Sequence, residues 1–198
     1  MKNKFIILLL VLILKLNFYN LVASDEFIFE VTDIEILENG NLYKGNNRGK
    51  IKTDKQIEII SDSFEYLKEK NLLKSYGNAQ LTDKVNNITI NAQKIFYNKN
   101  EEKIYTIGKT LINVSNKYTV NGNDLTLLKN EMILLSNKTA TIEDNYSNNY
   151  ILDKFQYYIN QEILKGETIE VNSNNGDKYF FEHGFLDLKE NKFLSKDI

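Results

Sequence analysis

The sequence predicts an all-β protein, an elongated array of antiparallel strands with repeats of about 30 residues. The first observation is a recurring segment, found as DSFEYL, QKIFYN, NDLTLL, DKFQYY and HGFLDL. The second is that apolar and polar residues alternate within each copy, as in strands with one buried face. The third is the absence of proline, which leaves every backbone N–H able to join a strand ladder. The copies place five residues in register at steps of 31, 30, 30 and 30: Phe64, Ile95, Leu125, Phe155 and Phe185.

Each repeat begins with a short alternating strand and then turns a corner. In ITINAQKIFY, Ile88 and Ile90 share one face, whereas the following apolar residues Ile95 and Tyr97 have the opposite parity. One extra residue in a strand moves all later side chains to the other face. We therefore expect a β-bulge or corner at Ala92-Gln93 and at the corresponding place in the other copies.

A polar hinge such as KEKN or NKNEEK follows, and then a return strand. Short polar segments of this kind join antiparallel strands. Gly77 and Gly108 occupy equivalent positions in two return strands, and a glycine inside a strand marks a bend or a close backbone approach. Ile34, which lies 30 residues before Phe64, indicates a sixth and weaker copy at the start of the array.

Residues 1–24 have the pattern of a secretory signal peptide. Lys2 and Lys4 precede an apolar run, Phe5 to Leu14, which Lys15 ends. A run of this length is too short to cross a bilayer, which needs about 20 residues. An uncleaved anchor is the alternative. Residues 25–198 are then expected to form one domain.

The charge balance argues against nucleic acid as a partner. The chain has a net charge of −2, and removal of the three lysines in the signal peptide would make it −5. Proteins that bind nucleic acid present a basic face to the phosphates. We therefore expect no nucleic-acid partner.

Side chains that carry enzyme chemistry are scarce. The chain has no cysteine and a single histidine, His183, so neither a typical zinc site nor a cysteine–histidine pair can form. His183 is expected at a solvated corner, and the acidic pairs Glu101-Glu102 and Glu143-Asp144 are expected to be solubilising loop charges. The segment ENGNLYKGNNRGK precedes a strand, which favours a turn over a phosphate-binding loop. We predict no enzymatic activity, no cofactor and no metal site; a hydrolase would need His183 or a specific carboxylate.

The apolar face of the repeats is the candidate binding surface. Periodicity alone leaves two interpretations open, namely a sealed core and an open groove. The residues on this face are Ile57, Ile59, Phe64, Tyr66, Ile88, Ile90, Ile95, Tyr97, Tyr118, Val120, Leu125 and Leu127.

The phased repeat resembles the OstA-like family of lipopolysaccharide-transport proteins, which includes LptA and the N-terminal domain of LptD. The matching segments are ITINAQKIFY with IYTIGKTLI and IEIISDSFEY with LLKSYGNAQL, and the resemblance covers Phe27 to Ile198. It implies an open β-jellyroll, solenoid-like in its repetition, in the periplasm and associated with the outer membrane.

The resemblance also implies a function and partners. The apolar face would be a trough that covers the lipid A acyl chains of lipopolysaccharide during transfer across the periplasm to the outer membrane, without enzymatic chemistry. Edge strands would pair with other Lpt jellyroll proteins, and an outer-membrane barrel is a further implied partner. The ending DKYFFEHGFLDLKENKFLSKDI is similar to the LptD N-terminal domain, although no barrel follows Ile198. The alternatives are an LptA-type bridge protein and a structural β-solenoid with a sealed core.

Overall fold

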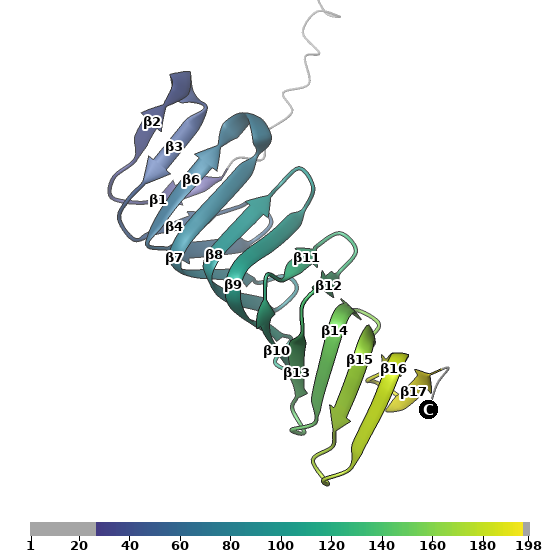
Figure 1. Ribbon diagram of the computed structural model, residues 1–198. Coiled ribbons are helices and arrows are strands. Elements are labelled where there is room, and N and C mark those ends of the chain that lie inside the picture. Colours follow the sequence, from purple (N-terminus) through teal and green to yellow (C-terminus); the bar gives the residue numbers. More distant parts are fainter. Residues whose placement is uncertain (1–26, 196–198) are drawn as a thin grey trace, which may run out of the picture.

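The protein is all-β, as predicted. The computed structural model describes residues 27–195, so the predicted signal peptide, residues 1–24, lies outside the described residues. Seventeen antiparallel strands join in one continuous sheet that forms an elongated array (Figure 1). Two short 3-10 turns, η1 (Glu38–Gly40) and η2 (Lys68–Lys70), complete the regular structure of this part. Within residues 27–195 no helix is long and apolar enough to span a bilayer.

Three long strands in the middle of the array show its plan. They are β7 (Leu72–Asp83), β8 (Ile88–Asn98) and β9 (Lys103–Val114), and the register of their pairing shifts once along each interface. The two halves of a long strand belong to different layers. Residues 80–83 of β7 pair with β5 (Ile57–Ser61), whereas residues 72–76 pair with β6 (Ser63–Leu67). The layer that contains β5 is called the first layer and the layer that contains β6 the second.

The same plan continues toward the N-terminus in shorter strands. In the first layer β1 (Ile28–Glu30) pairs with β4 (Gly49–Lys52), which pairs with β5. In the second layer β2 (Glu35–Leu37) pairs with β3 (Leu42–Gly45), which pairs with β6. These four strands occupy the place predicted for the sixth copy.

Toward the C-terminus, short strands give way again to long ones. The first layer contains β10 (Tyr118–Asn123) and β13 (Ala140–Asp144), and the second contains β11 (Thr126–Leu128) and β12 (Ile133–Leu135). The long strands β14 (Asn149–Tyr158), β15 (Ile163–Asn172) and β16 (Lys178–Asp187) cross both layers, and β17 (Lys192–Ser195) pairs with the second half of β16.

The two layers meet along a corner, and the predicted bends lie on it. Gly77 and Gly108 have φ values of 72° and 82°, which L side chains rarely adopt. The N–H of Gly108 donates to Asp124 Oδ1 at 2.7 Å, and the carbonyl of Gly77 accepts from the N–H of Asp62 at 3.0 Å. In β8 the pairing register shifts between Ala92 and Lys94, so the corner predicted at Ala92-Gln93 is confirmed.

Apolar side chains fill the space between the layers as one connected core. Alternate residues of each half-strand are buried, and the parity changes at the corner as the sequence pattern requires. One predicted register is wrong. Phe185 is 48% exposed, and its neighbour Leu186 is buried opposite Leu164. The last repeat is therefore one residue shorter than predicted, because the pairing of β15 with β16 sets its inward positions.

Candidate functional site

The space between the two layers is the candidate site, and we call it the slot. The structure brings all twelve predicted residues together there, and each is at most 8% exposed. Their exposed fractions are Ile57 1%, Ile59 1%, Phe64 1%, Tyr66 5%, Ile88 1%, Ile90 1%, Ile95 1%, Tyr97 0%, Tyr118 8%, Val120 0%, Leu125 1% and Leu127 2%. The slot is closed to water along these residues.

Side chains from the two layers meet across the slot. The ring of Phe29 stacks on Phe64 at 5.2 Å between centroids, and Tyr118 meets Tyr157 edge-on at 5.6 Å. Gly45 leaves room for one of these rings, because a Cβ atom at that position would lie 2.2 Å from a Phe64 ring carbon. Aromatic contacts of this kind stabilise the packing of the two layers beyond the effect of the buried area alone. The slot is occupied by the chain's own side chains.

Two rows of turns lie opposite the corner, and the gap between them is called the mouth of the slot. The first row joins β4 to β5, β7 to β8, β9 to β10 and β13 to β14, and the second joins β6 to β7, β8 to β9, β11 to β12 and β14 to β15. Backbone hydrogen bonds link neighbouring turns along each row. Ser115 donates to the carbonyl of Asn87 in the first row, and Lys129 donates to the carbonyl of Glu102 in the second. Each row is thus a continuous rim.

Ion pairs connect the two rims across the mouth. Each cross-mouth ion pair joins a charge in the first row to one in the second. The four pairs are Asp54–Lys99 (2.9 Å), Lys55–Glu102 (2.7 Å), Asp83–Lys129 (3.3 Å) and Lys117–Glu162 (2.7 Å). Lys129 also lies 3.3 Å from Glu102, so these charges form a network at the centre of the mouth.

Several of these charged side chains are buried, which corrects the expectation for Glu102. Glu102 was expected to be a solvated loop charge, but its side chain is 7% exposed. Lys99, in the NKNEEK hinge, is likewise buried, with a side chain 2% exposed. Asp83 and Lys129 are 1% and 8% exposed. Charges so far from water need partners, and the cross-mouth pairs supply them.

Tyrosines of the slot extend their hydroxyl groups to this network. Tyr97 donates to Glu102 at 3.1 Å, and Tyr118 donates to Glu162 at 2.9 Å. Burial, reinforced by these carboxylates, raises the pKa of both phenols well above the usual range. Each ring therefore packs in the apolar interior while its neutral hydroxyl reaches the charged rim.

Two carboxyl groups at the mouth, those of Glu102 and Glu162, are held in the ionised form. Burial opposes ionisation of Glu102, but hydrogen bonds from Lys55 and Tyr97 and the charge of Lys129 outweigh it and lower its pKa. At Glu162 the hydrogen bond from Lys117 is the largest cause, and the pKa is again lowered. Both carboxylates are charged at neutral pH.

A hollow opens on the central cross-mouth pairs. It has a volume of about 320 Å³ and is lined by Lys55, Val85, Asn86, Glu102, Lys129 and Asn130. Val85 is 65% exposed, and the side chain of Lys55 is 47% exposed. An apolar residue and a cation are therefore both accessible from water at this point of the mouth.

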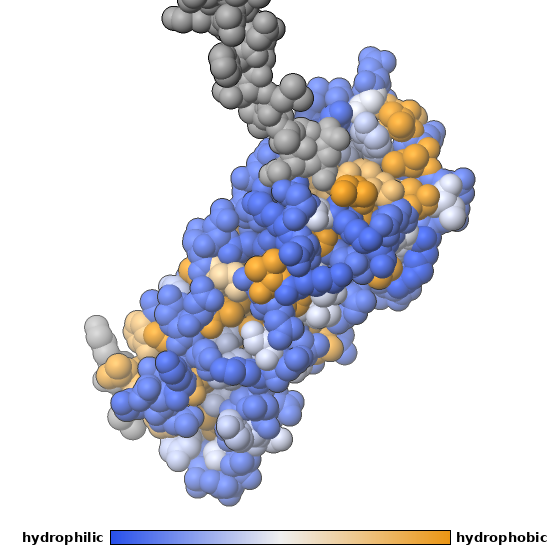
Figure 2. All heavy atoms as spheres, turned by 180° about the vertical axis from the view of Figure 1, so that it is seen from behind, coloured by the Kyte–Doolittle hydropathy of each residue, from blue (hydrophilic) through white to orange (hydrophobic). Residues whose placement is uncertain are grey.

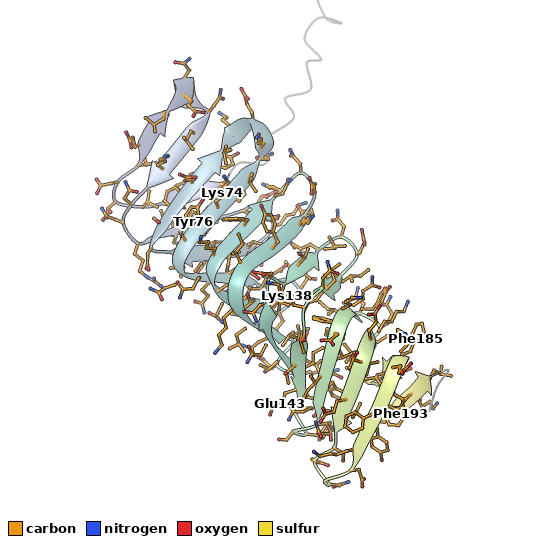
Figure 3. The ribbon with its side chains drawn as sticks, viewed as in Figure 1. Lys74, Tyr76, Lys138, Glu143, Phe185 and Phe193 are labelled. Atoms are coloured by element: carbon orange, nitrogen blue, oxygen red, sulfur yellow. The ribbon has the colours of Figure 1, made fainter. Side chains whose placement is uncertain are left out.

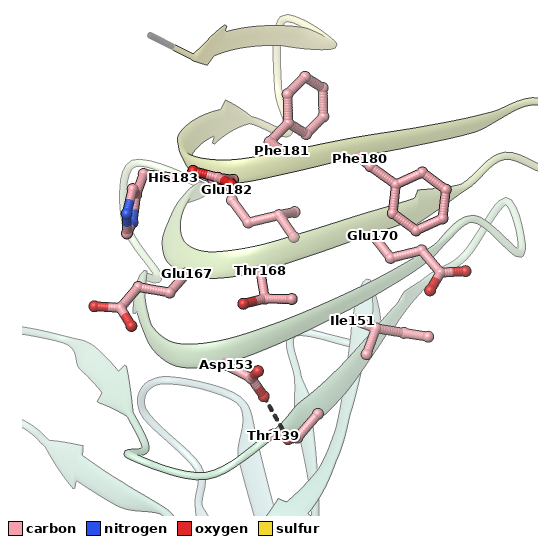
Figure 4. Close-up of a pocket in the computed structure, with 11 residues that line it drawn as sticks. Thr139, Ile151, Asp153, Glu167, Thr168, Glu170, Phe180, Phe181, Glu182 and His183 are labelled. Carbon is pink, nitrogen blue, oxygen red and sulfur yellow. Dashed lines mark hydrogen bonds between the residues drawn. The ribbon is translucent and has the colours of Figure 1, made fainter. Parts of the chain in front are cut away.

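A second and larger hollow, of about 860 Å³, lies on the outer side of the corner at β14, β15 and β16. Phe180, Ile151 and Glu170 line one side of it, and His183 stands at its margin (Figure 4). Three of its carboxylates have partners: Thr139 donates to Asp153, Lys154 pairs with Glu167 at 2.9 Å, and Asn172 donates to Glu170 at 2.9 Å. His183 is at a corner position, as predicted.

Both ends of the array present edge strands. Within residues 27–195, β1 and β2 each pair on one side only, and β17 pairs only with β16. Figure 2 shows hydrophobic patches toward both ends and along the middle of the face it draws, and Phe185 and Phe193 project from the last two strands (Figure 3). The exposed apolar residues are Ile28, Ile34 and Ile36 at one end and Tyr179, Phe180, Phe185, Phe193 and Leu194 at the other. Such edges are able to accept another strand.

The described residues contain no cluster of three or more histidine, cysteine or acidic side chains arranged to hold a metal ion. No protein-family model matches the sequence, and no curated protein matches it. The site must therefore be interpreted from its own chemistry.

Proposed function

We propose that this protein is a non-enzymatic periplasmic carrier of lipopolysaccharide, of the OstA-like type, that shields lipid A acyl chains between its two layers on the way to the outer membrane. The observation that carries the proposal is the continuous apolar slot with a charged rim, built from repeated bent strands. Removing an acyl chain from water is favourable by roughly 0.8 kcal/mol per methylene. The sugars and phosphates would remain in water at the mouth.

Photo-crosslinking tests the proposal directly. A photoreactive amino acid at Ile90 in the first layer or Leu127 in the second is expected to form adducts with purified lipopolysaccharide. Thr89 is the matched control, because it neighbours Ile90 on the opposite face of β8 and is only partly buried. Adducts at Thr89 alone, or none at Ile90 and Leu127, would overturn the proposal.

Assembly end to end is part of the same proposal, with the edge strands of one copy pairing with those of another. The free edges and exposed apolar residues at both ends support it. Sedimentation velocity is expected to show self-association that Leu194→Lys weakens, since Leu194 is 74% exposed on β17. A protein that stays monomeric at high concentration argues against this mode. The LptD-like and LptA-like versions of the proposal place the lipid in the same slot.

A structural β-solenoid with a sealed core is the second candidate. The almost complete burial of the twelve slot residues and the ion pairs across the mouth favour it. It predicts no lipid adducts at Ile90 under any condition, so the same experiment separates the two functions.

A further inference from the structure

We propose that the cross-mouth ion pairs are a gate, which must separate before an acyl chain enters the slot, and that Lys55 and Lys129 then exchange Glu102 for an anionic group of the amphiphile. The inference rests on the proposed function and assigns it a point of access. It concerns four pairs within the described residues, and Lys55–Glu102 is the one that lines the hollow at the mouth, with the lysine side chain 47% exposed.

The closed slot offers no path to a lipid. Its lining residues are at most 8% exposed, and rings from the two layers are in contact. A chain of methylenes needs these contacts to part. The layers are continuous through the corner, because β7, β8 and β9 cross from one layer to the other. Separation must therefore begin at the mouth.

The bonding at the mouth fits such a movement. In the described residues, side chains make the contacts across the mouth, whereas backbone hydrogen bonds run along each rim. Each rim is able to move as a unit without losing those backbone bonds. The corner opposite contains Gly77 and Gly108 at positive φ, where backbone constraint is least.

The charges favour one closed arrangement without locking it. Burying two ions costs several kcal/mol in desolvation, which largely offsets their attraction. When the rims separate, Lys99, Lys129, Asp83 and Glu102 regain water, and this hydration compensates for the lost pairs. A buried pair of this kind specifies the closed geometry more than it stabilises it.

The hollow at the mouth is where we expect the ligand to dock first. Lys55 and Lys129 lie there on either side of Glu102, and the exposed Val85 lies beside them. A phosphate oxygen accepts hydrogen bonds from lysine as well as a carboxylate does. An anionic amphiphile is the class of ligand that satisfies both the cations and the apolar contact.

Covalent closure of the mouth tests the gate. The chain has no cysteine, so an engineered pair reacts selectively with a short bis-maleimide. The test pair is Asp54→Cys with Lys99→Cys, which spans the mouth at the neighbouring ion pair and leaves Lys55, Lys129 and Glu102 unchanged. The control pair is Asn71→Cys with Asn100→Cys, whose native side chains lie 3.0 Å apart along the second rim. Each protein also carries the photoreactive residue at Ile90.

The outcomes separate the gate from the function. Before linking, the proteins with either cysteine pair are expected to form lipopolysaccharide adducts at Ile90. Linking across the mouth should abolish these adducts. Linking along the rim should leave them unchanged. Equal adducts from the linked and unlinked Asp54/Lys99 pair would overturn the gate and leave the proposed function standing. No adducts from any unlinked protein would overturn the proposed function.

A charge variant tests the exchange of partners. Glu102→Gln removes the carboxylate that competes with the ligand, and we expect roughly 5- to 30-fold faster uptake of lipopolysaccharide. The control is Glu58→Gln, because Glu58 pairs with Lys50 and Lys84 without crossing the mouth. Dephosphorylated lipopolysaccharide should gain much less from Glu102→Gln. Equal rates for wild type, Glu102→Gln and Glu58→Gln would contradict the exchange.

Discussion

The central strands β7 to β9 and the C-terminal strands β14 to β17 follow the same plan but close differently. In the centre, interior residues are almost fully buried. Three cross-mouth ion pairs lie close together there: Lys55–Glu102, Asp54–Lys99 and Asp83–Lys129. In the described residues, the last pair that crosses the mouth is Lys117–Glu162. Beyond it Asp144 instead accepts hydrogen bonds from its own turn and from Tyr150.

The difference shows that closure depends on neighbours and not on the repeat itself. A central strand has a partner on each side and a rim opposite, whereas within the described residues β17 at the end pairs only with β16, and its Leu194 is 74% exposed. In repeat arrays each unit gains its stability from the adjacent units. The end of the array is therefore suited to contacts with another molecule, and the centre to enclosure.

The largest expected contrast is in core truncation. Phe64→Ala should lower the free energy of unfolding by about 3–5 kcal/mol, because its ring is 1% exposed and packs on Phe29. Phe180→Ala should change it by less than about 0.5 kcal/mol. Urea unfolding followed by circular dichroism measures both. Similar losses in the two variants would show that Phe180, on the outer face of β16, contributes as much packing as an interior ring.

Removal of a charge at the mouth should have the next largest effect. Lys129→Met leaves the buried carboxylates of Asp83 and Glu102 without their shared cation, and we expect a loss of roughly 3 kcal/mol. Lys138→Met is the control. It removes an exposed pair with Asp124 at the corner and should cost less than about 1 kcal/mol. If Lys129→Met were neutral in the same unfolding measurement, the mouth network would contribute no closing interaction.

The corner should respond in opposite directions in the two regions. Gly108→Ala places a side chain at φ 82° and should destabilise the protein by about 1–2 kcal/mol. Near the C-terminus Thr168 has φ 47°, which is unfavourable for a β-branched residue. Thr168→Gly should therefore stabilise the protein by up to about 1 kcal/mol. Thermal unfolding of both variants checks the signs, and a destabilised Thr168→Gly would mean that no strain is stored there.

Acid should lower the stability of the central strands by protonating carboxylates at the mouth. We expect this effect to be smaller than those of the substitutions. The folded-state pKa of Glu102 is lowered, so its contribution is present above the unfolded pKa near 4.3 and is lost as pH falls through the folded value. Denaturant midpoints at pH 7 and pH 3 should differ less in Glu102→Gln than in wild type. An identical pH dependence in the two proteins would show that other carboxylates dominate acid unfolding.

The sequence predicted what depends on local periodicity. The corner at Ala92-Gln93, the bends at Gly77 and Gly108 and the shared face of the twelve slot residues all follow from spacings of a few residues or from the repeat. Periodicity left a sealed core and an open groove as alternatives, because it does not show how closely the two layers approach. The register of Phe185 was wrong because strand pairing fixes the last repeat, and pairing is not visible in a single interval of the sequence.

The ion pairs at the mouth were missed because their partners are far apart and resemble ordinary loop charges. Asp54 lies 45 residues before Lys99, Lys55 lies 47 before Glu102, and Lys117 lies 45 before Glu162. Opposite charges recur at this interval, which is about one and a half repeats. This recurrence is a sequence signal for the cross-mouth ion pairs. Its meaning depends on the layers facing each other, which the sequence pattern does not show.

That interval also sets an order of events during folding. The turn between β4 and β5 pairs across the mouth with the turn between β8 and β9, three strands farther along the array. While the chain is being synthesised, each new turn of the first rim must wait for about 45 more residues before its charged partner exists. We therefore expect neighbouring strands of a growing chain to pair first. The ion pairs across the mouth would form later, when synthesis has advanced by several more strands.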